Sequence, residues 1–193
     1  MRWLGLVLIV ALSQVYGCAT GLRPYADSSE LFTDGQTLWE VRIGRGSSQR
    51  FAGLLALNKK GEVLEVVLLD STGIKLLEEK VLATGKVEIV SALPVVRNNQ
   101  LGSFLGEGLF RLFFNSTEFT AEPCRGDGLF ELCFGLEEEG HLVKFKRLGP
   151  FVLWSGDYFI SNYDSLDVLT GAVINGGWLT PYLKLKKSGG RPE

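Results

Sequence analysis

Few residues in this chain are of the types, or in the spacings, that enzymes use. The 193 residues include one histidine, His141, which excludes a metal site with two histidines and leaves one candidate base for a serine nucleophile. The glycine-rich stretch GRGSS at residues 44–48 lacks the GxxxxGK[ST] spacing of a phosphate-binding loop, and no GxSxG motif occurs. His141 follows an acidic turn, where an exposed or cross-strand role is expected. We therefore predict a protein that is not an enzyme, with no catalytic residues and no cofactor.

Three aspartates in the last third of the chain are the remaining candidates for a metal site. Asp157, Asp164 and Asp167 lie close together in sequence, and carboxylates are ligands for calcium. They lack the spacing of a dedicated calcium loop, and aspartates in turns commonly bond to the backbone. We expect turn capping here and no metal site.

Cys18 is the residue whose surroundings indicate a chemical modification. Residues 1–17 combine Arg2, an apolar run at 3–12 and a more polar end at 13–17, as in an export signal peptide. The apolar run is too short for a membrane-spanning helix, which needs about 20 residues. The run VYGC at residues 15–18 resembles the lipobox of bacterial lipoproteins, in which the cysteine receives diacylglycerol before the signal peptide is removed. Ordinary secretory cleavage near Ala19 is the alternative.

Lipidation of Cys18 would attach the mature chain to a membrane surface. Diacylglycerol with a further acyl chain such as palmitate anchors a protein stably, whereas one chain does not. Ala19 stands where an aspartate signals inner-membrane retention in Gram-negative bacteria, so the resemblance implies the periplasmic face of the outer membrane. The whole chain has 20 basic and 22 acidic residues, which gives no basic surface for nucleic acid.

The other two cysteines agree with an oxidising compartment. Cys124 and Cys133 flank RGDGLFEL, in which Gly-Asp-Gly indicates a turn between two strand-like arms. A hairpin brings such ends within reach of a disulfide, and export permits the bond. A metal pair is the competing interpretation, which the single histidine and the lack of a CxxC motif disfavour. We predict a Cys124–Cys133 disulfide.

Short alternating segments separated by turn residues predict an antiparallel sheet. They recur at intervals of about 10–12 residues, and Asn, Asp and Gly mark their connections. The predicted strands are residues 37–43, 50–58, 62–69, 74–83, 86–90, 128–134, 141–147, 151–154, 158–163, 166–174 and 178–186.

Between the two groups of strands, the apolar spacing changes to three and four residues. This spacing runs from Leu101 to Leu112, after Pro94, which suits a first helical turn. The three glycines inside it would each cost about 1 kcal/mol relative to alanine. We predict one helix over residues 94–114, with a break near Gly102 as the alternative.

These elements predict a mainly β (α+β) fold. A long antiparallel sheet must curl, and its concave apolar face needs a cover. We expect an incomplete barrel of about 10–11 strands covered by one or two helices at residues 35–187. A lipoprotein signal peptide at 1–17 and a lipidated tether at 18–34 precede it, and a loose tail at 188–193 follows. The interior would include Leu55, Leu57, Val66, Leu68, Leu112 and Phe113.

The order of the elements resembles the LolA/LolB-like superfamily, the carrier and receptor that move lipoproteins to the outer membrane. Residues 51–78, FAGLLALNKKGEVLEVVLLDSTGIKLLE, are similar to its glycine-led strand, apolar strand and Asp-Ser-x-Gly turn. DYFISNYD at 157–164 and PYLKLK at 181–186 are similar to its later strands. The resemblance spans about residues 37–186, and Cys18 indicates the membrane-attached, LolB-like side.

The resemblance implies an apolar cavity that binds and releases lipid or lipoprotein acyl chains, lined by the six interior side chains named above. The sequence leaves open whether these line a cavity or fill a close-packed core. The receptor's protruding loop with an exposed leucine has no counterpart, because residues 44–49 are polar; a paralogue handling another lipid is therefore equally compatible. The alternative from another class is a non-catalytic envelope scaffold lipoprotein, which would be solid inside and expose an apolar patch to a protein partner.

Overall fold

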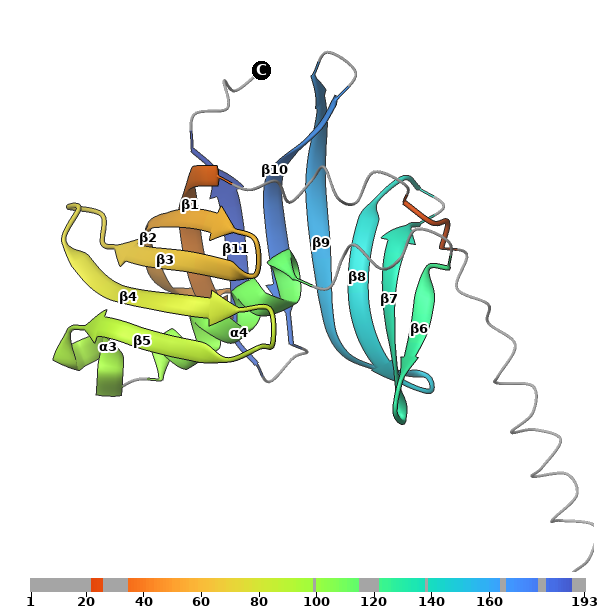
Figure 1. Cartoon of the computed structure of the whole chain (residues 1–193), viewed down its shortest axis with the longest axis horizontal. Helices are drawn as coiled ribbons and strands as arrows, with labels where there is room; N and C mark the ends of the chain where they lie inside the picture. The colour runs from red at the N-terminus through yellow and green to blue at the C-terminus, as the bar shows by residue number, and fades with distance from the viewer. Residues whose placement is uncertain are drawn as a thin grey trace, which may run out of the picture.

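The computed structural model describes residues 22–25, 35–98, 100–114, 122–137, 139–163, 166–176 and 180–188. In these ranges a single sheet of eleven antiparallel strands bends around one helix without closing into a barrel, and a second, shorter helix lies near β5 (Figure 1). The predicted mainly β fold, a curled sheet with few helices, is confirmed. The strands are β1 (Gly35–Arg45), β2 (Ser48–Lys60), β3 (Val63–Leu69), β4 (Lys75–Leu82), β5 (Val87–Ala92), β6 (Cys124–Asp127), β7 (Phe130–Leu136), β8 (Leu142–Leu148), β9 (Phe151–Tyr163), β10 (Leu166–Asn175) and β11 (Tyr182–Lys187).

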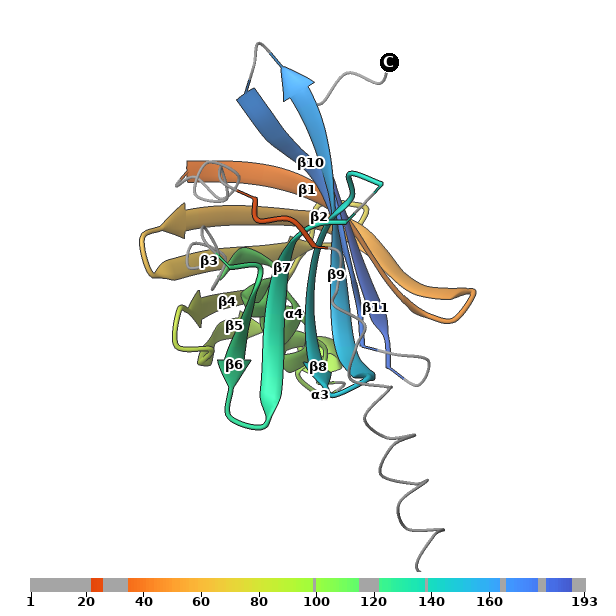
Figure 2. The ribbon, with the colours of Figure 1, turned by 90° about the vertical axis from the view of Figure 1, so that its right-hand side faces the viewer.

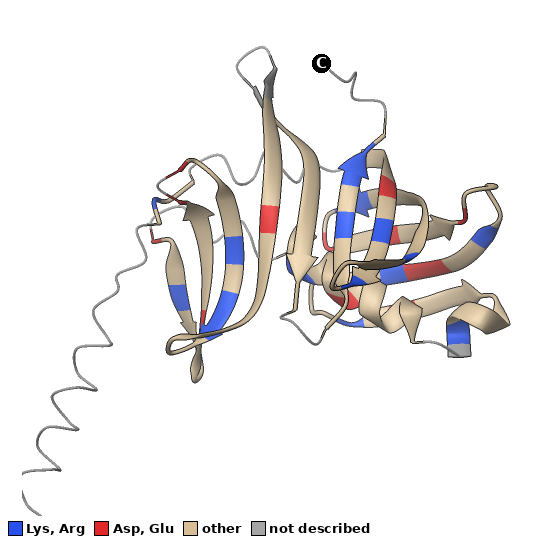
Figure 3. Cartoon of the chain, turned by 180° about the vertical axis from the view of Figure 1, so that it is seen from behind, with Lys and Arg blue, Asp and Glu red and all other residues tan. Residues whose placement is uncertain are grey.

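The sheet consists of two meanders joined where the first strand meets the last. The strand order is β5-β4-β3-β2-β1-β11-β10-β9-β8-β7-β6. Across the junction Glu40 pairs with Lys186 and Arg42 with Lys184, and Figure 3 shows basic residues recurring along β11. The two views at right angles place α4 between the β3–β5 half and the β7–β9 half (Figures 1 and 2). The junction therefore turns two local meanders into one curved sheet.

The core lies where alternating apolar residues of the sheet meet the helix. In β3, Leu64, Val66 and Leu68 are buried, while the residues between them are half-buried. In β11, Leu183 and Leu185 are buried on either side of exposed Lys184. These faces belong to one buried cluster that also contains the inner leucines of α4.

Two helices, α3 (Pro94–Asn98) and α4 (Leu101–Phe113), stand where one is predicted over residues 94–114. The break falls at Gln100, close to the alternative position at Gly102, and Gln100 adopts the left-handed conformation with φ 55°. In α4 the predicted amphipathic pattern is confirmed, because Leu105, Leu109 and Leu112 are fully buried on one face.

Two strand predictions are wrong in detail. Residues 151–154 and 158–163 belong to the single long strand β9, since the intervening Ser155, Gly156 and Asp157 pair with β8 and with β10. Residues 124–127 form a separate strand, β6, so the turn consists of Gly128 and Leu129 and comes later than the Gly-Asp-Gly signal suggested.

A disulfide and the packing of residues 22–25 stabilise the β6–β7 edge of the sheet. The Cys124–Cys133 disulfide is present and joins β6 to β7. Arg23, from the predicted tether, exchanges backbone hydrogen bonds of 2.8 and 2.9 Å with Leu136, and Tyr25 is buried with its ring edge-on to Phe134 at 6.4 Å. At residues 22–25 the predicted tether is therefore packed on the sheet.

Several sequence predictions fall outside the described residues. These are the signal peptide at 1–17, the lipidation site Cys18, most of the tether and the tail beyond Ser188. Within the ranges given above, no helix has the length and apolar character needed to cross a membrane.

Candidate ligand-binding site

Helix α4 is packed closely against the sheet on one side. A Cβ atom at Gly106 would lie 2.6 Å from Cγ1 of Val87, and one at Gly108 would lie 2.9 Å from Cδ2 of Leu183. Both distances are shorter than side chains allow, so these glycines permit the helix to approach β5 and β11. From the sequence alone, these glycines only lower the stability of the helix relative to alanine. The close packing explains why they occur there.

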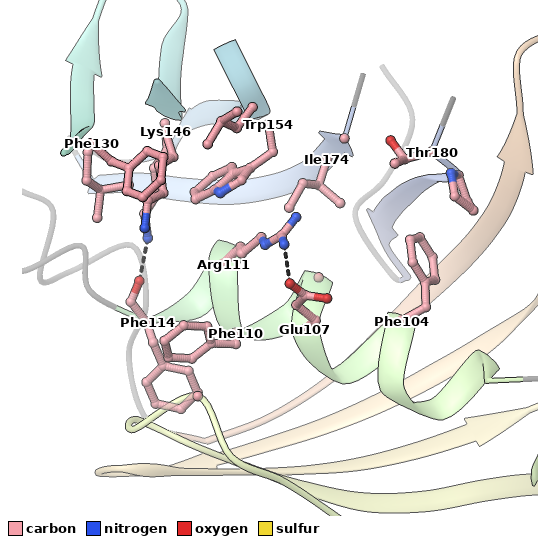
Figure 4. A pocket seen from close by; sticks show the side chains of 17 residues that line it. Phe104, Glu107, Phe110, Arg111, Phe114, Phe130, Lys146, Trp154, Ile174 and Thr180 are labelled. Carbon is pink, nitrogen blue, oxygen red and sulfur yellow. Dashed lines mark hydrogen bonds and ion pairs between the residues drawn. The ribbon is translucent and has the colours of Figure 1, made fainter. Parts of the chain in front are cut away.

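The other side of α4 borders a pocket of about 800 Å³. It lies between the helix and the concave face of β7–β10 (Figure 4). Its walls are largely aromatic and aliphatic, and six of the apolar side chains that form them are Phe104, Phe110, Phe114, Phe130, Leu132 and Trp154.

Charged side chains interrupt these apolar walls. Arg111 and Glu107, one turn apart on α4, form an ion pair. The Arg111 guanidinium also lies 5.4 Å from the centroid of the Trp154 ring. The ammonium of Lys146 lies 4.8 Å from the centroid of the Phe130 ring. Both cations thus rest on aromatic faces, an attractive arrangement.

Lys144 and Tyr158 connect the sheet to the C-terminal end of α4. Lys144 is buried, and its Nζ donates a hydrogen bond to the carbonyl of Phe114. Tyr158 Oη donates a hydrogen bond of 2.9 Å to the carbonyl of Leu112. The last carbonyls of a helix have no partner within it, so both bonds stabilise this end. Burial, with Arg125 nearby, lowers the pKa of Lys144 to about 7, and burial raises the pKa of Tyr158.

A buried carboxyl lies beneath the packed side of α4. Glu79 of β4 is fully buried on the same strand face as Leu77 and Val81. A Cβ atom at Gly106 would lie 3.2 Å from Glu79 Oε1. Among the described residues, neither carboxyl oxygen has a hydrogen-bond partner. Burial raises the pKa of Glu79 to about 8, so this carboxyl is mostly neutral at pH 7.

The six side chains predicted to line a ligand cavity lie together in the buried core. The pocket beside α4 is formed by other residues. Leu57 and Val66 also border a second hollow, of about 690 Å³, over β1–β4. It stays a prediction that a ligand contacts these six residues, which are Leu55, Leu57, Val66, Leu68, Leu112 and Phe113.

Sequence reasoning missed the cations of the pocket. Lys144 and Lys146 alternate with other residues in LVKFKRL, on the same strand face as buried Leu142. Phe104 and Arg111 follow helical spacing along the side of α4 away from the leucines. The alternation in β8 and the helical spacing in α4 can both be read from the sequence. Neither pattern reveals the space between the strand and the helix.

The predicted turn-capping role is wrong for Asp157, which lies within β9 and pairs with Val143 and Val173. Burial raises its pKa, and the nearby His141 opposes the shift. The side chains of Asp164 and Asp167 lie outside the described residues. Within the part of the chain that the structure describes, no three acidic, histidine or cysteine residues are grouped to hold a metal.

Exposed apolar side chains project from two neighbouring hairpin ends. Leu129, in the β6–β7 turn, is 84% exposed, and Phe151 and Val152, just after the β8–β9 turn, are 70% and 55% exposed. Pairing of Glu131 with Arg147 brings these turns to the same end of the sheet, seen at the foot of β6–β9 in Figure 1.

Comparison with solved structures finds distant similarities. No family model and no curated protein sequence matches the chain. A LolA superfamily protein, NE2245 from Nitrosomonas europaea, is similar with a TM-score of 0.42 and 10% identity, over 91% of this chain and 90% of that one. A DUF1329 family protein from Desulfovibrio piger is similar with a TM-score of 0.35 and 10% identity, over 84% and 87% of the two chains. The first belongs to the superfamily that the sequence pattern resembles.

Proposed function

We propose that the protein is a lipid-anchored, non-catalytic binding protein whose pocket beside α4 holds the acyl chains of a lipid or lipoprotein. The observation that supports this proposal is the pocket itself, about 800 Å³ in volume and walled mainly by aromatic and aliphatic side chains. Ligand sites commonly measure about 300–1,000 Å³, with apolar walls and a few polar groups that orient the ligand. The pocket has these properties.

The physical chemistry of acyl chains suits uptake and release without an energy source. Each methylene transferred from water to an apolar site contributes about 0.8 kcal/mol. A bilayer interior offers methylenes a similar environment, so exchange between pocket and membrane is close to balanced. In this proposal the protein shields a lipid from water and delivers it where a membrane or a partner accepts it.

The proposed anchor is Cys18, with the mature protein on the periplasmic face of the outer membrane. Because residues 22–25 pack against β7, only a short segment separates Cys18 from the sheet. Four residue steps span at most about 14 Å, which would keep the β6–β7 edge near the bilayer. The intact mass of membrane-extracted protein tests the anchor: we expect a chain beginning at acylated Cys18, and an unmodified chain beginning near Ala19 would contradict it.

Binding of the neutral dye 1-N-phenylnaphthylamine tests the pocket. The chain from Ala19 onward suits this assay, because it holds every described strand and helix. Leu153 lines the pocket and is 42% exposed, so Leu153→Asp places a charge in the apolar wall with little effect on folding. Val152→Asp is the matched control, since Val152 is exposed and outside the lining.

We expect saturable fluorescence enhancement that Leu153→Asp weakens and Val152→Asp leaves unchanged. An absence of enhancement, or equal losses in the two variants, would contradict the proposal.

The second candidate function is an envelope scaffold that binds a protein partner. The exposed apolar ends at Leu129, Phe151 and Val152 favour it, because clustered exposed apolar side chains commonly mark interaction surfaces. Loss of dye binding in Val152→Asp alone would move the site from the pocket to these hairpin ends and support this function instead.

A further inference from the structure

We infer that the pocket beside α4 selects amphiphiles whose head group is anionic. The inference rests on the proposed function and names the chemical class of its ligand. Three basic side chains lie on the pocket walls, Arg111, Lys144 and Lys146, whereas Glu107 is the acidic residue of the described lining. The chain as a whole carries a formal net charge of −2. The excess of positive charge is thus a local feature of the pocket.

Strand pairing brings these cations together. Lys144 and Lys146 are two positions apart in β8, so their side chains leave the same face of the sheet. Lys146 lies directly opposite Trp154 of β9, and the Arg111 guanidinium lies 5.4 Å from the centroid of that Trp154 ring. Figure 4 shows Lys146, Trp154 and Arg111 around one part of the pocket. Cations from the helix and from the sheet therefore border the same space.

The surroundings of the cations favour an anion. Lys146 and Arg111 rest on the rings of Phe130 and Trp154, at the boundary between apolar walls and water. Charge–charge attraction is stronger there than in bulk solvent. Arg125 of β6, which pairs with Leu132 of β7, adds a further positive charge near Lys144. A bound anion would offset the repulsion between these cations and favour the charged form of Lys144.

The arrangement suggests a bipartite ligand. The phenylalanines of α4 and the ring of Trp154 would contact the hydrocarbon, while Lys146 and Arg111 would contact the head group through charge-assisted hydrogen bonds. A carboxylate from a fatty acid and a phosphate from a phospholipid share this chemistry. A neutral acylated peptide end would lack the second set of contacts.

Displacement of 1-N-phenylnaphthylamine from the chain beginning at Ala19 tests the inference. The competitors share a twelve-carbon chain and differ in the head group: dodecanoate, dodecyl phosphate, dodecanol and dodecyltrimethylammonium, below their micellar concentrations and at fixed ionic strength. We expect either anion to compete about tenfold more strongly than the alcohol, and the cation to compete least. The ratio of dodecanoate to dodecyl phosphate distinguishes a carboxylate ligand from a phosphate ligand.

Lys146→Gln removes one cation without touching the bonds that hold the end of α4. We expect it to lower the ratio of displacement by the anions to displacement by the alcohol, a ratio in which any change in dye affinity cancels. Lys184→Gln, on the exposed outer face of β11, removes the same charge at a distance and is the control. Equal displacement by all four competitors, or equal effects of the two variants, would overturn the inference and leave acyl-chain binding intact. A protein that binds no dye would overturn the proposed function and the inference with it.

Discussion

Neutralising Glu79 should remove a pH-dependent cost from the folded state. The carboxyl is fully buried beneath α4, its oxygens lack hydrogen-bond partners among the described residues, and its pKa rises from 4.5 to about 8. In the unfolded chain this group releases its proton near pH 4.5, whereas the folded chain retains it up to about pH 8. The folded state therefore binds more protons in this window. Its stability should fall as pH rises from 4.5 to 8 and then level off.

The size of the effect follows from the two pKa values. One unit of pKa shift corresponds to about 1.4 kcal/mol. Between pH 5 and pH 7 this carboxyl alone should lower the free energy of unfolding by about 2.5 kcal/mol. Glu79→Gln keeps the shape of the side chain and removes its titration, so the difference between wild type and variant isolates this group from all others.

Urea denaturation at pH 5, 6, 7 and 8 measures that difference. Glu78→Gln is the matched control, because Glu78 is the neighbouring residue, bonds to Lys75 at 2.8 Å, and has a lowered pKa. The free energy of unfolding of wild type should fall relative to that of Glu79→Gln as pH rises. The difference between wild type and Glu78→Gln should show no such fall. A difference that stays constant within about 0.5 kcal/mol from pH 5 to pH 7 would refute a buried, neutral Glu79.

Three further experiments test the packing around α4 and the sheet edge. Gly106→Ala should lower the free energy of unfolding by about 1–3 kcal/mol through overpacking, whereas Gly126→Ala, with open space around it, should not; equal values would contradict the close approach of the helix. Tyr158→Phe removes a hydrogen bond to the end of α4 and should cost about 1–2 kcal/mol, with faster amide exchange in α4; unchanged exchange would contradict this role. Replacing Cys124 and Cys133 by serine should cost about 2–3 kcal/mol in thermal or urea unfolding, and alkylation of Cys124 or Cys133 in the unreduced protein would contradict the disulfide.

Much of the sheet could be predicted because each hairpin has its own local signal. At Asp70, for example, the side chain accepts hydrogen bonds from the backbone N–H groups of Thr72 and Ile74. The sequence Asp-Ser-Thr-Gly predicts a turn at this place. The pairing of β1 with β11 has no such signal, since it joins segments from opposite ends of the domain. The sequence therefore predicts the meanders and leaves their junction undetermined.

The interruption predicted within β9 shows how a local signal can mislead. Ser155, Gly156 and Asp157 are typical of a turn, yet all three are paired within the sheet. A Cβ atom at Gly156 would lie 3.3 Å from a methyl group of Leu112, so the glycine fits where the strand passes close to α4. Tertiary packing outweighs turn propensity at this position.

The interior was predictable and the pocket was not. Alternation identifies Leu55, Val66 and Leu68 as inward-facing, and all three are buried. A pocket is the space left between two surfaces, however, and periodicity reports each surface alone. Here the pocket lies between α4 and β7–β10. The close packing at Gly102, Gly106 and Gly108 and the hydrogen bonds from Lys144 and Tyr158 join the helix to the sheet beside it.

The central claim, that the pocket beside α4 holds lipid, is tested most directly by native mass spectrometry. The chain from Ala19 would be purified from cells without detergent, measured intact, and then denatured so that any released molecule can be extracted and identified. We predict a stoichiometric co-purifying lipid, with an anionic head group, that is lost in Leu153→Asp and retained in Val152→Asp. A mass equal to that of the protein alone, unchanged after incubation with lipid vesicles, would contradict the claim.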